Sequence, residues 1–241
     1  MAQQDGFLRE VDEALREQEM LAALKRYGRM VAIAIVIVLV AVGGYLWWEH
    51  SRAAARGERG EQLTLALDQV EGARLDVAKA QLAPLAASSS ADGSQAAAQL
   101  LQAGILAEQG KIAEAVNGFA AVASDDTAPR PYRDLATIRQ VALGFDGMPA
   151  DQVVARLKPL AVPGKPFFGS AGELLGIAYM KQGHNDLAGP LFAAISRDKT
   201  VPETLRRRAR QMSGLLGVDA VDDVNQAANG DAQGAPAGAV Q

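Results

Sequence analysis

The segment that decides the fold is LGIAYMKQGHNDLAGPLF, residues 175–192. It holds small and aromatic residues in a regular order, namely Gly176, Tyr179, Gly183, Ala188 and Phe192. Apolar residues recur every three or four positions on both sides of Gly183, which is typical of amphipathic helices. Because glycine readily takes the left-handed conformation that ends a helix, the segment predicts two helices joined at Gly183. Gly176 and Ala188 then allow a close approach of helices, and Phe192 fills the gap to the next hairpin.

The same order of residues occurs earlier in the chain, so the hairpin is repeated. Four glycines, Gly72, Gly110, Gly147 and Gly183, are spaced 38, 37 and 36 residues apart. A near-constant period of this length indicates stacked helical hairpins. After Gly72 and Gly147 the apolar positions fall one residue later than after the other two, which predicts a longer turn there. The two clear repeats align at equal offsets: Ala103, Leu106, Gly110, Ala115, Phe119 and Val122 with Gly176, Tyr179, Gly183, Ala188, Phe192 and Ile195.

This order of residues resembles the tetratricopeptide repeat. The likeness is strongest over residues 175–192, with Pro202 following, and weaker over residues 103–119. It implies an all-α fold, a solenoid of tetratricopeptide-like helical hairpins, and an ordinary helical bundle remains the alternative. The composition agrees with a helical fold, because alanine is abundant and no convincing strand pattern appears beyond Glu49.

Local patterns predict where the later helices begin and where the stack ends. Ser170 with Glu173, and Thr200 with Glu203, have the spacing of capping boxes at helix N-termini. A helix over residues 201–216 has no partner helix after it in the sequence pattern. We therefore expect this helix to cap the stack.

A second decisive segment is residues 30–48, which contains no charged residue. As a helix with a rise of about 1.5 Å per residue it spans roughly 28 Å, close to the thickness of the bilayer hydrocarbon. The segment is apolar on every face and longer than the core of a signal peptide. We therefore expect an uncleaved membrane anchor, rather than a buried core helix or a cleaved signal peptide. The basic and aromatic residues that flank and end it are Lys25, Arg26, Arg29, Tyr45, Trp47 and Trp48.

The composition of the 241-residue chain narrows the classes of function. A formal net charge of −4 gives no electrostatic case for nucleic-acid binding. Cysteine is absent, and neither His50 nor His184 has a partner at metal-ligand spacing. The arginines at positions 206, 207, 208 and 210 spread over more than one helical face, which favours a solvated cap over an anion site. No catalytic constellation occurs, so we expect a protein that is not an enzyme, with no cofactor, metal or small-molecule substrate.

The layout as a whole, over residues 12–217, resembles the ancillary SecYEG translocon subunit family of bacterial membrane-anchored tetratricopeptide proteins. The likeness rests on LKRYG at 24–28, YLWW at 45–48, and GELLG at 172–176 followed by TVP at 200–202 and an arginine-rich helix. Members of that family face the periplasm, attach to the translocon and work with periplasmic chaperones. The resemblance implies the same partners for this chain. A related cell-division coordinator branch is soluble, and the uncleaved anchor argues against it.

These features predict the domain organisation and the topology. We expect a cytoplasmic N-terminal segment at residues 1–29, a transmembrane helix at 30–48, a repeat domain at 49–217 and a disordered tail at 218–241. Basic residues concentrate just before the anchor, which favours a cytoplasmic N-terminus in the bacterial inner membrane and a periplasmic repeat domain. The expected function is a membrane-tethered scaffold for protein interaction at the translocon. An assembly or coordination factor for another cell-envelope or division complex is the alternative.

Overall fold

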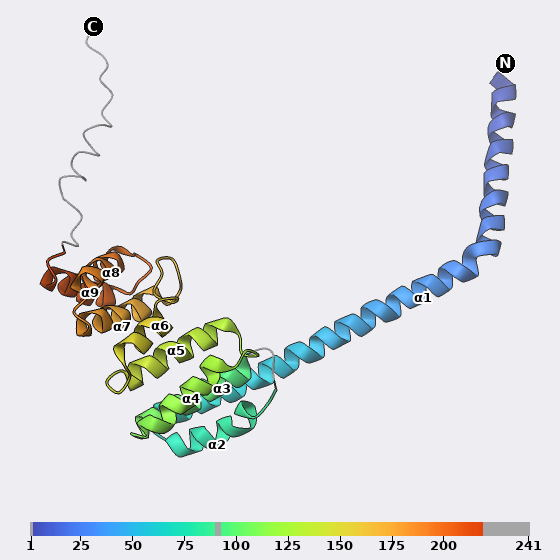
Figure 1. The fold of residues 1–241 in the computed structure, drawn as a ribbon. Helices are drawn as coiled ribbons and strands as arrows, with labels where there is room; N and C mark the ends of the chain where they lie inside the picture. Colours follow the sequence, from blue (N-terminus) through green and yellow to red (C-terminus); the bar gives the residue numbers. More distant parts are fainter. Residues whose placement is uncertain (1, 90–92, 219–241) are drawn as a thin grey trace, which may run out of the picture. The chain divides into compact units, whose positions relative to one another are not determined.

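The computed structural model describes residues 2–89 and 93–218, with side chains from Gly28 onward except that of Val31. Within these residues the chain forms nine helices and no strand (Figure 1), which confirms the all-α prediction. The predicted tail lies outside the described residues, apart from Val218. The chain divides into two compact units, residues 1–58 and 59–241. The helices are α1 (Ala2–Glu71), α2 (Leu75–Ala86), α3 (Ser94–Glu108), α4 (Ile112–Ser124), α5 (Arg130–Gly144), α6 (Ala150–Leu157), α7 (Phe168–Lys181), α8 (Asn185–Arg197) and α9 (Glu203–Leu215).

The first unit contains the apolar segment, which is part of α1. This stretch is long and apolar enough to cross a membrane, and its side chains are not buried within the protein. Aromatic and basic groups meet at its end. The Arg52 guanidinium carbon lies 3.7 Å from the centroid of the Trp48 ring, and the Tyr45 and Trp48 rings are 6.4 Å apart. Arg52 therefore makes a cation–π contact beside the apolar stretch.

In the second unit, consecutive helices pair into hairpins that stack against one another. The turns of α1 from Arg59 onward share a buried cluster with α2, α3 pairs with α4, α5 is followed by the short α6, and α7 pairs with α8, before α9. Clusters of buried side chains join each hairpin to the next. Ala66 of α1, Leu82 of α2 and Ile105 of α3 share one such cluster, and another joins α5, α6 and α7. This is the arrangement of a helical solenoid.

Four turns of the second unit close in the same way, with one residue in the left-handed conformation. The backbone φ angle is 57° at Ala73, 75° at Gly110, 78° at Gly183 and 74° at Gly217. The left-handed conformation predicted for Gly110 and Gly183 is thus confirmed. In each turn, the backbone N–H of the residue that follows the left-handed one donates a hydrogen bond to the carbonyl oxygen five residues earlier. The four bonds are 2.8 to 2.9 Å long and run from Arg74 to Gln69, Lys111 to Leu106, His184 to Tyr179, and Val218 to Ser213.

The longer turn predicted for the first hairpin is wrong. The left-handed residue there is Ala73 and not Gly72, so the pattern starts one residue later. Counted from Ala73, the buried residues Ala66 and Ala78 fall at the same offsets as their counterparts in the next hairpin. The longer turn predicted for the third hairpin is confirmed, since five residues link α5 to α6 and three link α3 to α4.

Replacing Ala73 with glycine should stabilise the repeat domain. A residue with a Cβ is strained by roughly 1–2 kcal/mol in the left-handed conformation, and glycine removes that strain. We expect a gain of about 1 kcal/mol, and a loss of about the same size for the reciprocal change Gly110→Ala. Thermal unfolding of the detergent-solubilised protein measures both. Midpoints that move in the same direction for the two variants would contradict the shared closure.

Both predicted capping boxes are wrong. Helix α7 begins two residues before Ser170, which therefore lies inside the first turn. Helix α9 begins directly after Pro202, whose φ of −55° and ψ of 142° make it the N-cap residue. The Thr200 N–H and hydroxyl instead donate to Asp198 Oδ1, at 2.8 and 2.6 Å. These bonds stabilise the charged carboxylate, so they lower the pKa of Asp198.

Helix α9 covers the last hairpin without a second helix of its own in the described part of the chain. Its Leu205 and Ala209 are buried in one cluster with Phe192 of α8. The chain then turns at Gly217 and comes back onto α8. A Cβ placed on Gly189 would lie 2.6 Å from Val218 Cγ2, so the glycine leaves the space that Val218 occupies.

Candidate functional site

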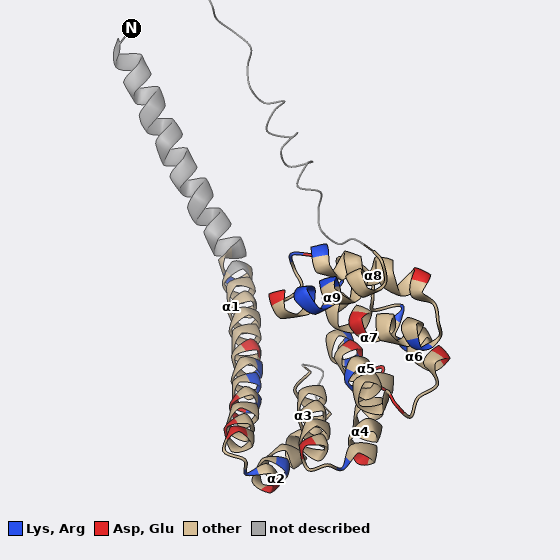
Figure 2. Cartoon of the chain, turned by 90° about the vertical axis from the view of Figure 1, so that its left-hand side faces the viewer, with Lys and Arg blue, Asp and Glu red and all other residues tan. Residues whose placement is uncertain are grey.

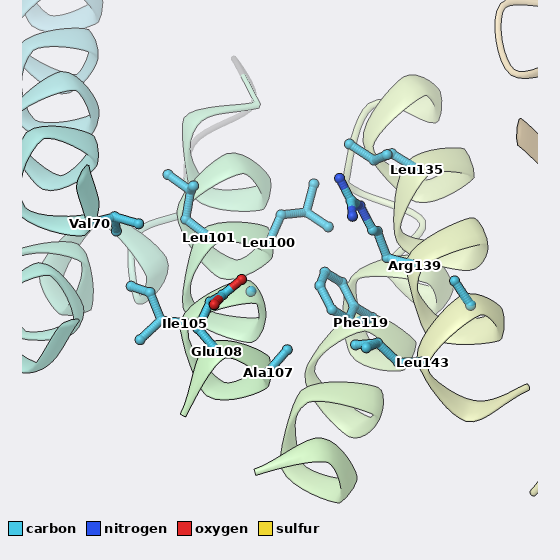
Figure 3. A pocket seen from close by; sticks show the side chains of 12 residues that line it. Val70, Leu100, Leu101, Ile105, Ala107, Glu108, Phe119, Leu135, Arg139 and Leu143 are labelled. Atoms are coloured by element: carbon cyan, nitrogen blue, oxygen red, sulfur yellow. The ribbon is translucent and has the colours of Figure 1, made fainter. Parts of the chain in front are cut away.

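An open groove lies on one side of the second unit (Figure 3). Its volume is about 490 Å³, and residues of α1, α3, α4 and α5 line it. Two of the lining side chains carry charge, those of Glu108 and Arg139. The other lining residues are Val70, Leu100, Leu101, Gly104, Ile105, Ala107, Phe119, Leu135, Ala142 and Leu143.

Helix α3 presents a continuous strip of residues to the groove. Leu100, Gly104 and Ala107 are four and three residues apart, the spacing that places residues on one helical face. Glu108 lies at the C-terminal end of this strip and is exposed. The next face of the helix is different, because Ala103 is buried. The same helix thus supplies both the core and the groove.

Helix α5 forms the opposite side of the groove in the same manner. Leu135, Arg139 and Ala142 follow one another at helical spacing and remain partly or fully exposed. Their neighbours Ala136 and Val141 are fully buried in the core. Leu135 and Ala142 are therefore apolar residues that the fold leaves available to a partner.

The Phe119 ring lies beneath the groove, between α3 and α5. It is 4% exposed and forms one buried cluster with Ala103 and Ala115. Leu100 and Leu143, which line the groove, pack against this cluster. The structure thus brings together the three buried residues that the sequence singled out in the earlier repeat. Its turn residue, Gly110, is exposed where α3 ends and α4 begins.

The later repeat places its residues in the last hairpin. A Cβ on Gly176 would lie 2.5 Å from Cζ of Phe192, so the ring packs directly on the helix backbone. Ala188 and Phe192 are fully buried, and Tyr179 is half-buried at their cluster. Gly183 is exposed at the turn. These residues join α7, α8 and α9.

Ion pairs link helices in this later part of the unit. Lys181 Nζ on α7 lies 3.1 Å from Asp146 Oδ1, just after α5. The Arg208 guanidinium on α9 donates two hydrogen bonds to the Glu173 carboxylate on α7, at 2.8 and 2.9 Å. That carboxylate raises the pKa of Arg208. Figure 2 shows the basic residues gathered on α9.

The two charged residues of the groove, unlike those of the ion pairs above, have no charged partner among the described residues. Arg139 and Glu108 are both exposed, and within the described residues neither side chain takes part in an ion pair or hydrogen bond. Figure 3 shows the Arg139 side chain extending from α5 over the space towards α3. The groove therefore offers an apolar floor with one free cation and one free anion at its sides.

The arginine cluster of α9 divides into paired and free members. Arg208 bonds Glu173, and Arg206 forms an ion pair with Glu203. The other two arginines of the cluster are exposed to solvent. This distribution agrees with the solvated cap predicted from the sequence.

The residues predicted to flank the membrane anchor lie on α1. Arg29, Tyr45, Trp47 and Trp48 are exposed, and the side chains at positions 25 and 26 lie outside the described set. Among the described residues, no group of three or more histidine, aspartate or glutamate side chains lies close enough to hold a metal ion.

Sequence reasoning missed the groove. The helical periodicity of the sequence gives no sign that residues of α3 and α5, Arg139 among them, line an open space. One signal was present in the sequence: Gly104 interrupts a helix directly after Ala103, where no turn is needed. A glycine in the middle of a helix calls for a reason such as close approach of another chain.

A family model described as a tetratricopeptide repeat-like domain matches residues 23–200 of the chain. The match begins within α1 and reaches the loop between α8 and α9. No curated protein and no solved structure matches the chain.

Proposed function

The chain belongs to the tetratricopeptide repeat-like domain family, and we propose that the groove between α3 and α5 binds a segment of a partner protein. Domains of this kind are protein-interaction scaffolds built from stacked hairpins. One observation carries the proposal: half-exposed leucines line a groove of about 490 Å³. Ligand pockets fall in the range of roughly 300–1,000 Å³ and are mostly apolar with a few polar groups. The groove has this character.

The proposal includes membrane attachment through α1. The apolar stretch is long enough to span a bilayer, and the interfacial aromatic residues Tyr45, Trp47 and Trp48 lie at its end. We place the N-terminal segment in the bacterial cytoplasm and the repeat domain in the periplasm. Tethering raises the effective concentration of the scaffold near membrane complexes, so that weak contacts become useful. The protein acts by binding and not by catalysis.

We further propose that the partner is the SecYEG translocon, which the scaffold links to periplasmic chaperones. The support is the resemblance in layout: the basic residues before the anchor, the YLWW end of the apolar segment and the last repeat with its arginine-rich helix. An assembly or division complex of the envelope would use the same groove. The partner's identity is therefore what the experiment has to decide.

Photo-crosslinking in membranes tests the proposed function. A crosslinking amino acid is introduced in place of Ala142, which is exposed and lines the groove. The control replaces Leu187 of α8, which is exposed but does not line the groove. We expect a crosslink to a translocon subunit from position 142 and none from position 187. A crosslink to an envelope-assembly or division protein would keep the scaffold but refute the translocon. Equal crosslinking from both positions, or none from 142, would refute the groove.

A further inference from the structure

Gly104 is the residue in the groove that internal packing does not explain. It lies inside α3 with a helical backbone, so it is not needed for a turn. A Cβ added to it would meet nothing within 4 Å. Glycine within a helix lowers stability relative to alanine. The chain therefore carries this cost without a packing gain in the free protein.

Two other helical glycines of the repeat domain have a clear structural reason, whereas Gly214 of α9, which does not line the groove, also has nothing within 4 Å of an added Cβ. A Cβ on Gly118 would lie 3.0 Å from Cβ of Ala103, and one on Gly172 would lie 2.8 Å from Cδ1 of Ile195. Those glycines allow helices to approach within the protein. Since the space beside Gly104 is the groove itself, this glycine would allow the close approach of another molecule in the same way.

The charges beside the groove narrow the chemistry of that occupant. Arg139 on α5 and Glu108 on α3 are exposed and make no ion pair in the described part of the chain. An occupant with an acidic group near Arg139 and a basic group near Glu108 satisfies both. An occupant of a single charge sign would be attracted by one side and repelled by the other.

Resting on the proposed function, we propose that the groove takes a mixed-charge apolar segment of a partner protein, which packs its backbone against Gly104. Its apolar side chains contact Leu100 and Leu135. An acidic side chain pairs with Arg139, and a basic side chain pairs with Glu108. Charge complementarity of this kind sets the register and direction of a bound segment more than its affinity.

The chain's own C-terminal residues fit the groove less well. Residues 219–241 contain four aspartates and no lysine or arginine, so they offer nothing to Glu108. They also contain few large apolar side chains. A partner segment with both charges and leucine-like anchors matches the lining residues better.

Labelled leucine-containing peptides test the inference with the full-length protein in nanodiscs. One peptide set carries a glutamate and a lysine at varied separations, and the control sets carry two glutamates or two lysines. We expect the best mixed-charge peptide to bind about three- to tenfold more tightly than the control peptides. The double variant Arg139→Glu with Glu108→Arg should prefer the same peptide with its two charges exchanged.

Gly104→Leu fills the groove and is the decisive variant. We expect it to weaken binding of the mixed-charge peptide by about tenfold or more while the thermal midpoint does not fall. Gly104→Ala is the matched control, with a raised midpoint and a smaller loss of binding. Unchanged binding by Gly104→Leu would overturn the inference, as would equal affinity for all peptide sets.

The outcomes also separate this inference from the proposed function. A crosslink from position 142 with no peptide preference refutes the charge register and leaves the groove as the partner site. If position 142 gives no crosslink and no peptide binds, both the proposed function and this inference are refuted. If removal of residues 219–241 raises peptide affinity about tenfold, the chain's own tail is the occupant and the inference fails.

Discussion

Replacing Gly176 with leucine is expected to destabilise the last hairpin by about 3 kcal/mol, the largest stability effect that we expect from a single substitution in this chain. A Cβ at this position would lie 2.5 Å from Cζ of Phe192 and 2.8 and 2.9 Å from its two Cε atoms. The ring cannot withdraw, because it is fully buried among Phe168, Ala188 and Ile195. The higher helix propensity of leucine offsets only about 1 kcal/mol of this cost.

Chemical denaturation of the detergent-solubilised protein measures the effect. Gly104→Leu is the matched control, since the same substitution there meets open space. Combining Gly176→Leu with Phe192→Ala should recover part of the loss, because the new side chain fills the space of the ring. If Gly176→Leu alone leaves the midpoint unchanged, the packing of α7 on α8 is not as described.

Two charges in the middle of the apolar stretch should release the protein from membranes. Each charged residue at the centre of a spanning helix costs about 2.5–3.5 kcal/mol of insertion. The double variant Ile37→Lys with Val38→Asp therefore makes membrane insertion less favourable by roughly 5–7 kcal/mol. This shifts the equilibrium between membrane and water by several powers of ten. Carbonate extraction of membranes measures it: the parent protein should stay in the pellet and the variant should appear in the supernatant.

The matched control places the same charges elsewhere on α1. Leu65→Lys with Leu67→Asp changes two residues that are 48% and 43% exposed in the second unit, and it should leave the protein in the membrane. Protease added to spheroplasts then tests the direction of insertion. Digestion from Glu49 onward, with the N-terminal segment spared, supports the proposed orientation. A mature N-terminus near Arg56 would show a cleaved signal sequence instead.

Much of the fold followed from a few local rules of the sequence. Gly110 and Gly183 identified two hairpin turns correctly, because a glycine next to a helical pattern marks the left-handed closure. The first turn was misplaced by one residue, because Gly72 is adjacent to Ala73 and an alanine in that conformation carries no sequence signal. The capping boxes failed for a related reason: Pro202 and the preceding Asp198 turn decide where α9 begins, and the spacing of polar residues does not.

The groove was beyond the reach of the same rules. Periodicity shows that α3 has a buried face, but it does not show whether the adjoining face is covered by the next hairpin. That depends on how hairpins stack, and here Leu100 and Leu135 end up on opposite sides of a space that remains open. For the same reason the sequence gives no sign that Arg139 lines a groove. Gly104 gave the one hint, since a glycine within a helix lowers stability and no neighbouring atom here requires the absence of a Cβ.

The turn at Gly217 has a consequence for engineering the length of this protein. It has the closure that elsewhere leads from the first helix of a hairpin to the second, and Val218 already rests on α8. The described solenoid therefore ends with α9, the first helix of a further hairpin, and with the same left-handed turn that joins α1 to α2, α3 to α4 and α7 to α8. A copy of α8 spliced in after Gly217 would meet the outer face of α9, where Arg210 takes the place of the small residue at Gly176. Extending the array thus calls for an Arg210→Gly change as well as an added helix, which gives a modular route to longer versions.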